Sequence, residues 1–244
     1  NSCNSNIPPS KDEYKVQNHR EKSNKKQGGQ KGRRGKTLTV KEEERNSVLT
    51  ELSNLGIVYL HLDIMDGKFV PNTTEGVGML KKINKFDFVF DTHLMVADPI
   101  NYIDKFYKAG SDIITFHFEA VKDVLPLIRK IHSLGIKCGV SIKPATNPEV
   151  LLPYLKDIDQ ILIMSVEPGF GGQKFMDSAL DKIKYFDDLR NNCDDYNYLI
   201  EVDGGINLNN VEMIRRAGAN VVVMGTALIN SESKKEVIGM VDSL

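Results

Sequence analysis

The chain has 244 residues, of which 41% are hydrophobic and 27% are charged, and its formal net charge is −1. These values fit one globular domain with a sizeable core, and no apolar run approaches the roughly 18 residues that a membrane-spanning helix needs. The three cysteines, Cys3, Cys138 and Cys193, have no CxxC spacing, which argues against a cysteine zinc site and against a disulfide framework. We therefore expect a cytoplasmic protein without a membrane partner.

Residues 1–36 differ in charge from the rest of the chain. They carry ten Lys and Arg against three Asp and Glu, a net charge of +7, whereas residues 37–244 carry −8. The segment is also poor in apolar side chains whose burial could offset the entropy of ordering. We predict a disordered basic extension over 1–36 and a folded domain over 37–244. Basic tails attract polyanions without specificity, so nucleic acid is not an expected partner, although a polyanion-binding tail stays open as an alternative.

From residue 42 onward, amphipathic stretches alternate with short β-branched runs, which is the pattern of repeated βα units around a parallel sheet. The predicted strands are 57–63, 88–95, 112–118, 136–142, 159–166, 198–203 and 220–225. The predicted helices are 42–55, 77–84, 99–108, 120–134, 148–156, 176–191, 208–217 and 233–243. Glycines at 110, 135 and 218 are expected where a helix ends and the next strand begins. Eight helices and seven clear strands indicate an α/β fold of the TIM (β/α)8 barrel type.

Polar residues recur at every second position of these strands, so they share one face. They are His61, Asp63, Asp91, His93, Thr115, His117, Ser141, Lys143, Glu201 and Asp203. In an open antiparallel sheet such a face would simply be solvated. In a parallel sheet with helices on its outer face, it points into the barrel, where unpaired ionisable groups are costly. Side chains that converge there, toward the C-terminal ends of the strands, indicate a functional site.

Four of these residues, from three strands, have the composition of a metal site. Two imidazoles and two carboxylates would come together from His61, Asp63, His93 and Asp203. This set suits a divalent cation such as Zn, Fe, Mn or Co, and the residue types do not select among these ions. A single strand histidine is more often a hydrogen-bonded core residue, so the prediction depends on the coincidence of all four.

Three glycine-containing turns each follow a strand and precede a helix, where backbone N–H groups can bind phosphate. They lie at residues 167–175, 203–207 and 224–227. The loops after strands seven and eight of a TIM barrel commonly hold phosphate. Each turn taken alone indicates only a change of direction, but three in order predict a phosphate site.

Several of these segments also resemble the signature motifs of ribulose-phosphate 3-epimerases. They are HLDIMDGKFVPN at 61–72, DTHLMV at 91–96, MSVEPGFGGQ at 164–173, EVDGG at 201–205 and MGTA at 224–227. The resemblance runs from about residue 42 to residue 244. It implies a metal-dependent isomerase that interconverts D-ribulose 5-phosphate and D-xylulose 5-phosphate in pentose phosphate metabolism. The implied mechanism is two-base proton transfer at C3 through a metal-stabilised enediolate.

The same resemblance implies a role for individual residues. The acid/base pair would be Asp63 and Asp203, and the metal ligands His61, Asp63, His93 and Asp203. The residues in contact with the enediolate would be Met65, Met95 and Met164, although a methionine by itself more often indicates core packing. Supporting roles would fall to His117 and Lys143. The substrate-binding residues would be His93, Gly169, Gly171, Gly172, Gly204, Gly205, Gly225 and Thr226.

The resemblance breaks down at the first barrel strand. The family has a sequence close to Ile-x-Pro-Ser-Ile-Leu-Ser-Ala-Asp there, and its first serine contacts the substrate. That slot falls here on residues 35–40, and Gly35 takes about the serine position. Either Lys36 to Val40 forms a substitute strand, or the barrel has a gap that would leave two neighbouring strands with unpaired edges. The predicted fold is therefore a TIM barrel whose first strand is missing or replaced.

Two other functions stay open at this point. One is a related epimerase that acts on a six-carbon ketose phosphate. The other, from a different class, is a catalytically impaired barrel with a polyanion-binding tail. The expected partner is a small pentose phosphate, and the sequence leaves open whether the protein forms a homo-oligomer.

Overall fold

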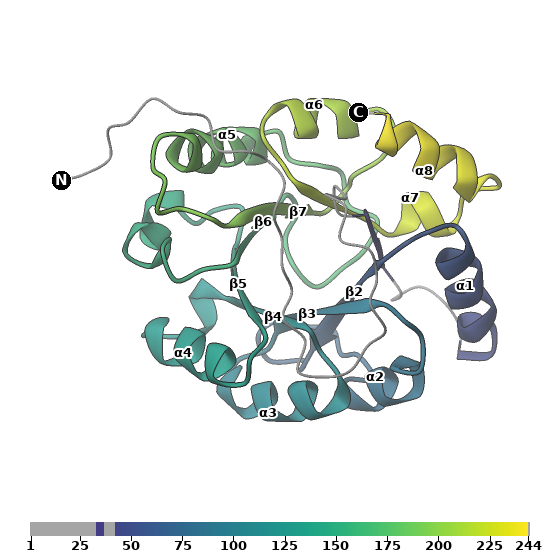
Figure 1. The fold of residues 1–244 in the computed structure, drawn as a ribbon, viewed down its shortest axis with the longest axis horizontal. Coiled ribbons are helices and arrows are strands. Elements are labelled where there is room, and N and C mark those ends of the chain that lie inside the picture. Colours follow the sequence, from purple (N-terminus) through teal and green to yellow (C-terminus); the bar gives the residue numbers. More distant parts are fainter. Residues whose placement is uncertain (1–32, 37–41, 244) are drawn as a thin grey trace.

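A computed structural model describes residues 33–36 and 42–243 of the chain. Within these residues, eight parallel strands pair in sequence order and form a closed barrel, with the helices outside it (Figure 1). The strands are β1 (Arg33–Lys36), β2 (Tyr59–Met65), β3 (Val89–Met95), β4 (Ile113–His117), β5 (Lys137–Ile142), β6 (Gln160–Met164), β7 (Leu199–Asp203) and β8 (Val221–Met224). The predicted TIM barrel is confirmed.

The helices follow the predicted pattern, with differences in start, type and number. They are α1 (Glu42–Asn54), α2 (Val77–Ile83), α3 (Ile100–Ala109), η1 (Phe118–Ala120), α4 (Leu125–Ser133), η2 (Pro148–Tyr154), α5 (Ser178–Asn191), α6 (Val211–Arg216), α7 (Thr226–Ile229) and α8 (Lys234–Asp242). The helix predicted over 120–134 begins only at Leu125. The helix predicted over 148–156 is the 3₁₀ helix η2, because Pro153 inside it has no N–H to donate to an α-helical hydrogen bond.

Glycines end helices where the sequence predicted them, since those at 110, 135 and 218 all have positive φ. The short helix α7 was not predicted. In the described part of the chain, no helix combines the length and the apolar character needed to cross a bilayer.

The strand β1 occupies the slot in which the sequence indicated a missing or replaced strand. Gly35 is the register partner of Leu60 in β2 and of Met224 in β8, so the first strand is replaced and the barrel has no gap there. All four residues of β1 lie in the segment 1–36 that we assigned to the extension, and of the segment from Lys36 to Val40 only Lys36 is among the described residues. Residues 1–32, 37–41 and 244 lie outside the described residues.

Two layers of side chains follow from the alternation along the strands. The outward-facing residues Leu60, Phe90, Phe116 and Val202 belong to one hydrophobic core together with helix residues such as Ile128. Many of the inward-facing residues are polar, as predicted, and these are buried: His61, Asp63, Asp91, His93, Thr115, His117, Ser141, Glu201 and Asp203. The interior of the barrel therefore holds many polar side chains, together with apolar ones such as Leu162.

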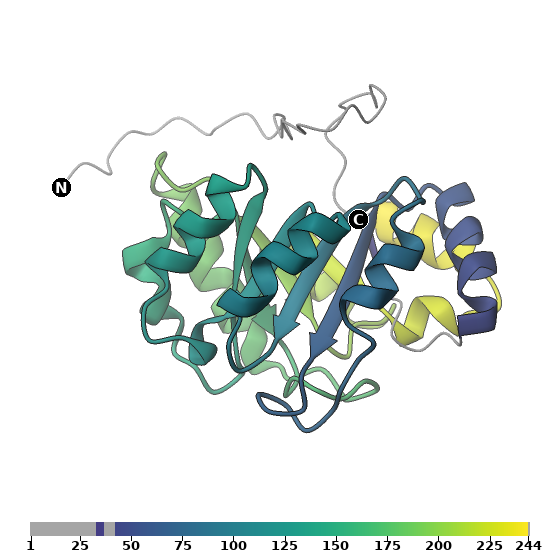
Figure 2. The same cartoon turned by 90° about the horizontal axis from the view of Figure 1, so that it is seen from below.

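All strands run in one direction, so their C-terminal ends meet at the same end of the barrel. In Figure 2 the strand arrows point toward the lower edge, where the blue loop after β2 extends. Asp203 is the last residue of β7, and Met65, Met95 and Met164 are the last residues of β2, β3 and β6. The predicted site residues therefore lie at the end of the barrel where TIM-barrel active sites are found.

Candidate functional site

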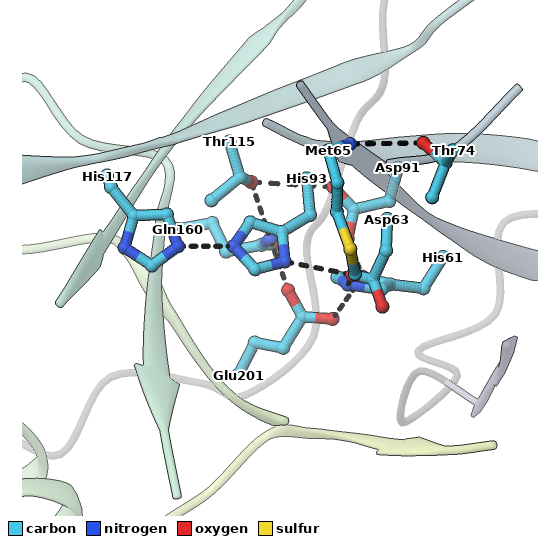
Figure 3. A network of polar contacts seen from close by, with 10 residues as sticks. All are labelled: His61, Asp63, Met65, Thr74, Asp91, His93, Thr115, His117, Gln160 and Glu201. Atoms are coloured by element: carbon cyan, nitrogen blue, oxygen red, sulfur yellow. Dashed lines mark hydrogen bonds and ion pairs between the residues drawn. The ribbon is translucent and has the colours of Figure 1, made fainter. Parts of the chain in front are cut away.

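The four predicted metal ligands lie together inside the barrel. Asp63 of β2 and His93 of β3 are register partners. His61, Asp63, His93 and Asp203 each offer one ligand atom, and these atoms all lie within 4.8 Å of one another. None of the four is more than 2% exposed. Figure 3 shows the side chains of His61, Asp63 and His93 pointing toward one another.

His61 has one nitrogen in a hydrogen bond and one without. Its Nδ1 lies 2.9 Å from Oδ2 of Asp91 and 3.5 Å from Oε1 of Glu201. Its Nε2 has no hydrogen-bond partner among the described residues, although it lies 3.2 Å from Oδ1 of Asp63. With the proton on Nδ1 donated to Asp91, Nε2 presents a lone pair toward Asp63. A cation between these two atoms would satisfy both, so the residues present fit a divalent metal.

The surrounding carboxylates also control the charge of His61. Burial alone would lower its pKa, but the carboxylates of Asp63, Asp91 and Glu201 around the ring raise the pKa well above its ordinary value. A positive charge, either a proton or a cation, is therefore favoured where Nε2 faces Asp63. A metal ion would bind the neutral imidazole in place of a proton, so the same carboxylates would suit both states.

The two nitrogens of His93 face different partners (Figure 3). Nδ1 lies 3.0 Å from Oδ1 of Asp63, and Nε2 lies 2.9 Å from Nε2 of His117. His117 in turn places its Nδ1 3.2 Å from Oε2 of Glu119, in η1. A chain of hydrogen bonds thus leads from the cluster of His61, Asp63, His93 and Asp203 to a carboxylate beyond the end of β4.

Burial and hydrogen bonds separate the charge states of these last two residues. Burial lowers the pKa of His117 to about 4, although its hydrogen bond to Glu119 acts in the opposite direction. Burial alone would raise the pKa of Glu119, but hydrogen bonds from His117, from the Lys143 N–H and from the Thr146 hydroxyl lower the pKa to about 2. At neutral pH, His117 is therefore neutral and Glu119 is ionised.

A second set of buried polar contacts joins Gln160, Thr115, Asp91 and Glu201. Gln160 donates to Oγ1 of Thr115 at 3.3 Å and to Oε2 of Glu201 at 2.5 Å. Thr115 Oγ1 lies 3.5 Å from Oδ1 of Asp91. These contacts hold Asp91 and Glu201, the two carboxylates nearest to Nδ1 of His61, in a fixed position.

Sequence reasoning did not single out Gln160 or Glu119. Gln160 opens β6 two residues before the inward-facing Leu162, so the same alternation, extended by one step, would have found it. Glu119 follows His117 by two residues but lies beyond the strand in η1. Strand alternation therefore carries no information about the direction of its side chain.

The three predicted methionines are buried at the ends of their strands. Met65 and Met95 are register partners and pack together with Val70. Met164 is the register partner of Asp203. They form an apolar rim beside the cluster of acidic and imidazole groups, and their contact with a substrate stays a prediction.

The glycines after β7 are required by close packing between loops. Gly204 and Gly205 both have positive φ, 127° and 61°. A Cβ atom on Gly204 would lie 2.5 Å from the side chain of Val166, and one on Gly205 would lie 2.3 Å from the backbone nitrogen of Phe175. These two positions therefore hold the loop after β7 against the loop after β6.

The remaining predicted glycines have different surroundings. Gly169 is buried against Val70, whereas a Cβ atom on Gly171 or Gly172 would meet nothing within 4 Å. Gly225 follows β8 and is half-buried, and the side chain of Thr226 lies outside the described residues. The three turns all follow C-terminal strand ends, as predicted, and phosphate binding by them stays a prediction.

A closed parallel barrel with a buried cluster of histidines and aspartates at its C-terminal end defines a TIM-barrel protein with an enzyme-like site. Residues 37–229 match the model of the Ribulose-phosphate 3 epimerase family. The chain belongs to the ribulose-phosphate 3-epimerase family, as the sequence motifs indicated.

Relatives of known name agree with this membership. A ribulose-phosphate 3-epimerase of Schizosaccharomyces pombe is 42% identical over 187 residues, which cover 75% of this chain and 80% of that protein. One of Bacillus subtilis is 40% identical and covers 73% of this chain and 83% of that protein. A cytoplasmic isoform of Oryza sativa is 38% identical and covers 75% of this chain and 81% of that protein.

Solved structures share the fold at lower identity. A 3-hexulose-6-phosphate synthase from Salmonella typhimurium has a TM-score of 0.65 and 16% identity, covering 87% of this chain and 97% of that chain. A mutant tryptophan synthase α-subunit from Pyrococcus furiosus has a TM-score of 0.61 and 18% identity, covering 88% of this chain and 98% of that chain. These similarities concern the barrel alone.

Proposed function

We propose that this protein is a metal-dependent isomerase that interconverts D-ribulose 5-phosphate and D-xylulose 5-phosphate by epimerisation at C3. The observation that carries the proposal is the convergence of His61, Asp63, His93 and Asp203, whose ligand atoms lie within 4.8 Å of one another at the C-terminal end of the barrel. The names of the relatives support the choice of substrate.

Asp63 and Asp203 are the proposed proton-transfer pair. They come from β2 and β7, on either side of β1 and β8 in the barrel order. Inversion at a carbon atom requires a base on one face to remove the proton and an acid on the other face to return it. In one direction of the reaction Asp63 removes the C3 proton and Asp203 donates one, and in the other direction the roles exchange.

The four residues of the cluster are also the proposed metal ligands. Zinc, iron, manganese and cobalt all suit two imidazoles and two carboxylates. When bound, the cation would supply positive charge that stabilises the negative charge developing on the oxygens of the enediolate. The unpartnered Nε2 of His61 supports this assignment, and Asp91 holds that imidazole in the required orientation.

The remaining predicted residues are proposed to hold the substrate. Sulfur atoms of Met65, Met95 and Met164 carry no proton, so they can exclude water from the enediolate without protonating it. The phosphate and sugar contacts are proposed for His93, Gly169, Gly171, Gly172, Gly204, Gly205, Gly225 and Thr226. Backbone N–H groups of the loops after β7 and β8 are the proposed phosphate donors. We also propose a cytoplasmic location, which the name of the rice relative supports.

The test is a substrate panel on the purified full chain before and after metal removal. We expect conversion of ribulose 5-phosphate, a loss of about 100-fold or more after chelation, and recovery with at least one of the four ions, because a Lewis acid contributes several kcal/mol. Full turnover after complete metal removal would contradict the metal requirement.

The same panel separates the other functions that the sequence left open. Turnover of a six-carbon ketose phosphate in place of the pentose would identify the related epimerase. No turnover of any substrate, together with RNA binding that survives physiological salt, would identify the impaired barrel with a polyanion-binding tail.

A further inference from the structure

We propose that His117 and Glu119 are positioning residues that set the tautomer and the orientation of His93, so that the Nδ1 lone pair of His93 faces the metal site. This inference rests on the proposed metal site and extends it to two residues outside the ligand set. None of the hydrogen bonds described above joins His117 or Glu119 to His61, Asp63 or Asp203.

Glu119 fixes the direction of the hydrogen-bond chain. Its Oε1 accepts a hydrogen bond from the backbone N–H of Lys143 at 2.7 Å and another from the hydroxyl of Thr146. An ionised carboxylate can only accept, so His117 Nδ1, 3.2 Å from Oε2, must be the donor. His117 therefore carries its proton on Nδ1 and a lone pair on Nε2.

The lone pair of His117 then determines the tautomer of His93. The two Nε2 atoms lie 2.9 Å apart and share one proton, which His93 must supply. His93 Nδ1 is left with a lone pair, 3.0 Å from Oδ1 of Asp63. Two acceptors at this distance repel each other unless a cation or a proton lies between them. The chain thus directs the lone pair of His93 into the ligand cluster.

Packing keeps the ring of His117 in place. Its centroid lies 4.8 Å from the ring of Phe69 and 4.9 Å from the ring of His93. The ammonium of Lys143 lies 4.1 Å from the centroid of Phe69, on the same side of the barrel. Since His117 itself is fully buried, the ring cannot turn away without displacing these neighbours.

Glu119 is supported from the loop after β5. That loop is held by Lys182 of α5, whose Nζ donates to the carbonyl oxygens of Lys143, Pro144 and Thr146 at 2.9, 2.7 and 2.7 Å. The two groups of this loop that donate to Glu119 are therefore fixed in turn. The structure provides a rigid acceptor at the far end of the chain.

His61 offers an internal comparison. Its Nδ1 meets the carboxylate of Asp91 directly, which is the usual arrangement for a metal-bound histidine. For His93 a second imidazole stands between the ligand and its carboxylate. His117 and Glu119 together would then fix the tautomer and orientation of His93, as Asp91 does for His61.

The test compares His117→Leu with His117→Gln in the full chain. At position 117, the Oε1 atom of a glutamine can take the place of the histidine Nε2 and accept the hydrogen bond from His93. Leucine has a similar size but no acceptor atom. We expect His117→Leu to weaken binding of Zn²⁺, measured by chelator competition, by about 10–100-fold, and His117→Gln to recover most of that loss. Nitrogen NMR of the histidines in metal-free protein should show the Nε2–H tautomer of His93 in the wild type and in His117→Gln only.

The outcomes separate this inference from the proposed function. If the wild type binds none of the four divalent ions, both the metal site and the positioning role are wrong. If the wild type binds Zn²⁺ and the leucine variant binds it equally well, or if both variants lose affinity equally at unchanged thermal stability, only the positioning role is wrong. Should His117→Leu fail to fold, Glu119→Gln replaces it. The single amide oxygen of glutamine cannot accept both from His117 and from the Lys143 and Thr146 donors. This variant should weaken Zn²⁺ binding in the same direction, and unchanged affinity would overturn the role.

Discussion

Histidine and aspartate side chains contact each other at both ends of this barrel, but the two contacts differ in solvent exposure. Between α4 and the start of β6, Nε2 of His132 lies 2.8 Å from Oδ2 of Asp159, and the two side chains are 41% and 30% exposed. At the C-terminal end, His61 and His93 place nitrogens 3.2 Å and 3.0 Å from Oδ1 of Asp63, and none of these side chains is more than 1% exposed. The residue types are the same, but the surroundings differ.

The two clusters differ in how completely their polar groups are hydrogen-bonded. In the exposed pair, His132 and Asp159 are hydrogen-bonded to each other, and Asp159 also accepts from the backbone N–H of Cys138 at 2.8 Å. An exposed pair of this kind contributes little to stability. In the buried cluster two imidazoles approach one carboxylate oxygen, and Nε2 of His61 is left without a hydrogen bond among the described residues. Buried groups that are kept unsatisfied mark a place for a ligand rather than a contribution to folding.

The largest expected effect is on kcat, and it distinguishes Asp63 and Asp203 at the C-terminal end of the barrel from Asp159 at the other end. Asp63→Asn and Asp203→Asn should each lower kcat by about 10²–10⁴-fold, because an amide can neither remove nor return the proton. Asp159→Asn should leave kcat unchanged. Steady-state kinetics on metal-supplemented protein measure the effect, and circular dichroism shows whether each variant is folded. Full activity of either of the first two variants would overturn the two-base assignment.

A smaller effect tests how tightly the polar interior is packed. Gly139 of β5 faces into the barrel, and a Cβ atom there would lie 2.2 Å from Oγ1 of Thr115, so Gly139→Ala should lower the free energy of unfolding by about 1–3 kcal/mol. The control is Gly239→Ala in α8, where a Cβ atom meets nothing within 4 Å and should add about 0.5–1 kcal/mol. Urea denaturation measures both. Equal stability of Gly139→Ala and the wild type would show that the interior is loose.

The smallest effect comes from the exposed pair and depends on pH. The hydrogen bond to Asp159 raises the pKa of His132, against the effect of burial. The contribution of His132 to stability is therefore complete below the ordinary pKa of histidine and is lost as the pH rises through the raised value. Burial alone would raise the pKa of Asp159, but hydrogen bonds from His132 and from the Cys138 N–H lower it. On the acid side, the contribution is lost as the pH falls from the ordinary aspartate pKa through the lowered value.

Unfolding free energies at about pH 6 and about pH 9 measure this contribution. The wild type should lose more stability over this interval than His132→Gln, by less than about 1 kcal/mol, because water screens the pair. Identical pH dependence in the two proteins would show that the hydrogen bond does not perturb His132 in solution.

The inward direction of the site residues could be read from the sequence because a strand places alternate side chains on opposite faces. Once the strand 57–63 was identified, His61 and Asp63 had to share a face, and parallel strands brought His93 and Asp203 to the same end. The family could also be read directly, because its motifs are runs of adjacent residues. Helix type was less accessible: the periodic pattern over 148–156 did not reveal that Pro153 leaves only a 3₁₀ helix.

The βα alternation, the face on which the four predicted ligands lie and the family could all be inferred from the sequence, since each depends on residues a few positions apart. The completion of the barrel by Arg33–Lys36 required the folded chain. Four residues without an apolar pattern carry no strand signal, and their position depends on hydrogen bonds to β2 and β8. The folded chain also shows that Glu119 supports His117 and which nitrogen of His93 faces Asp63. Those contacts join separate elements, and their geometry exists only when the barrel is closed.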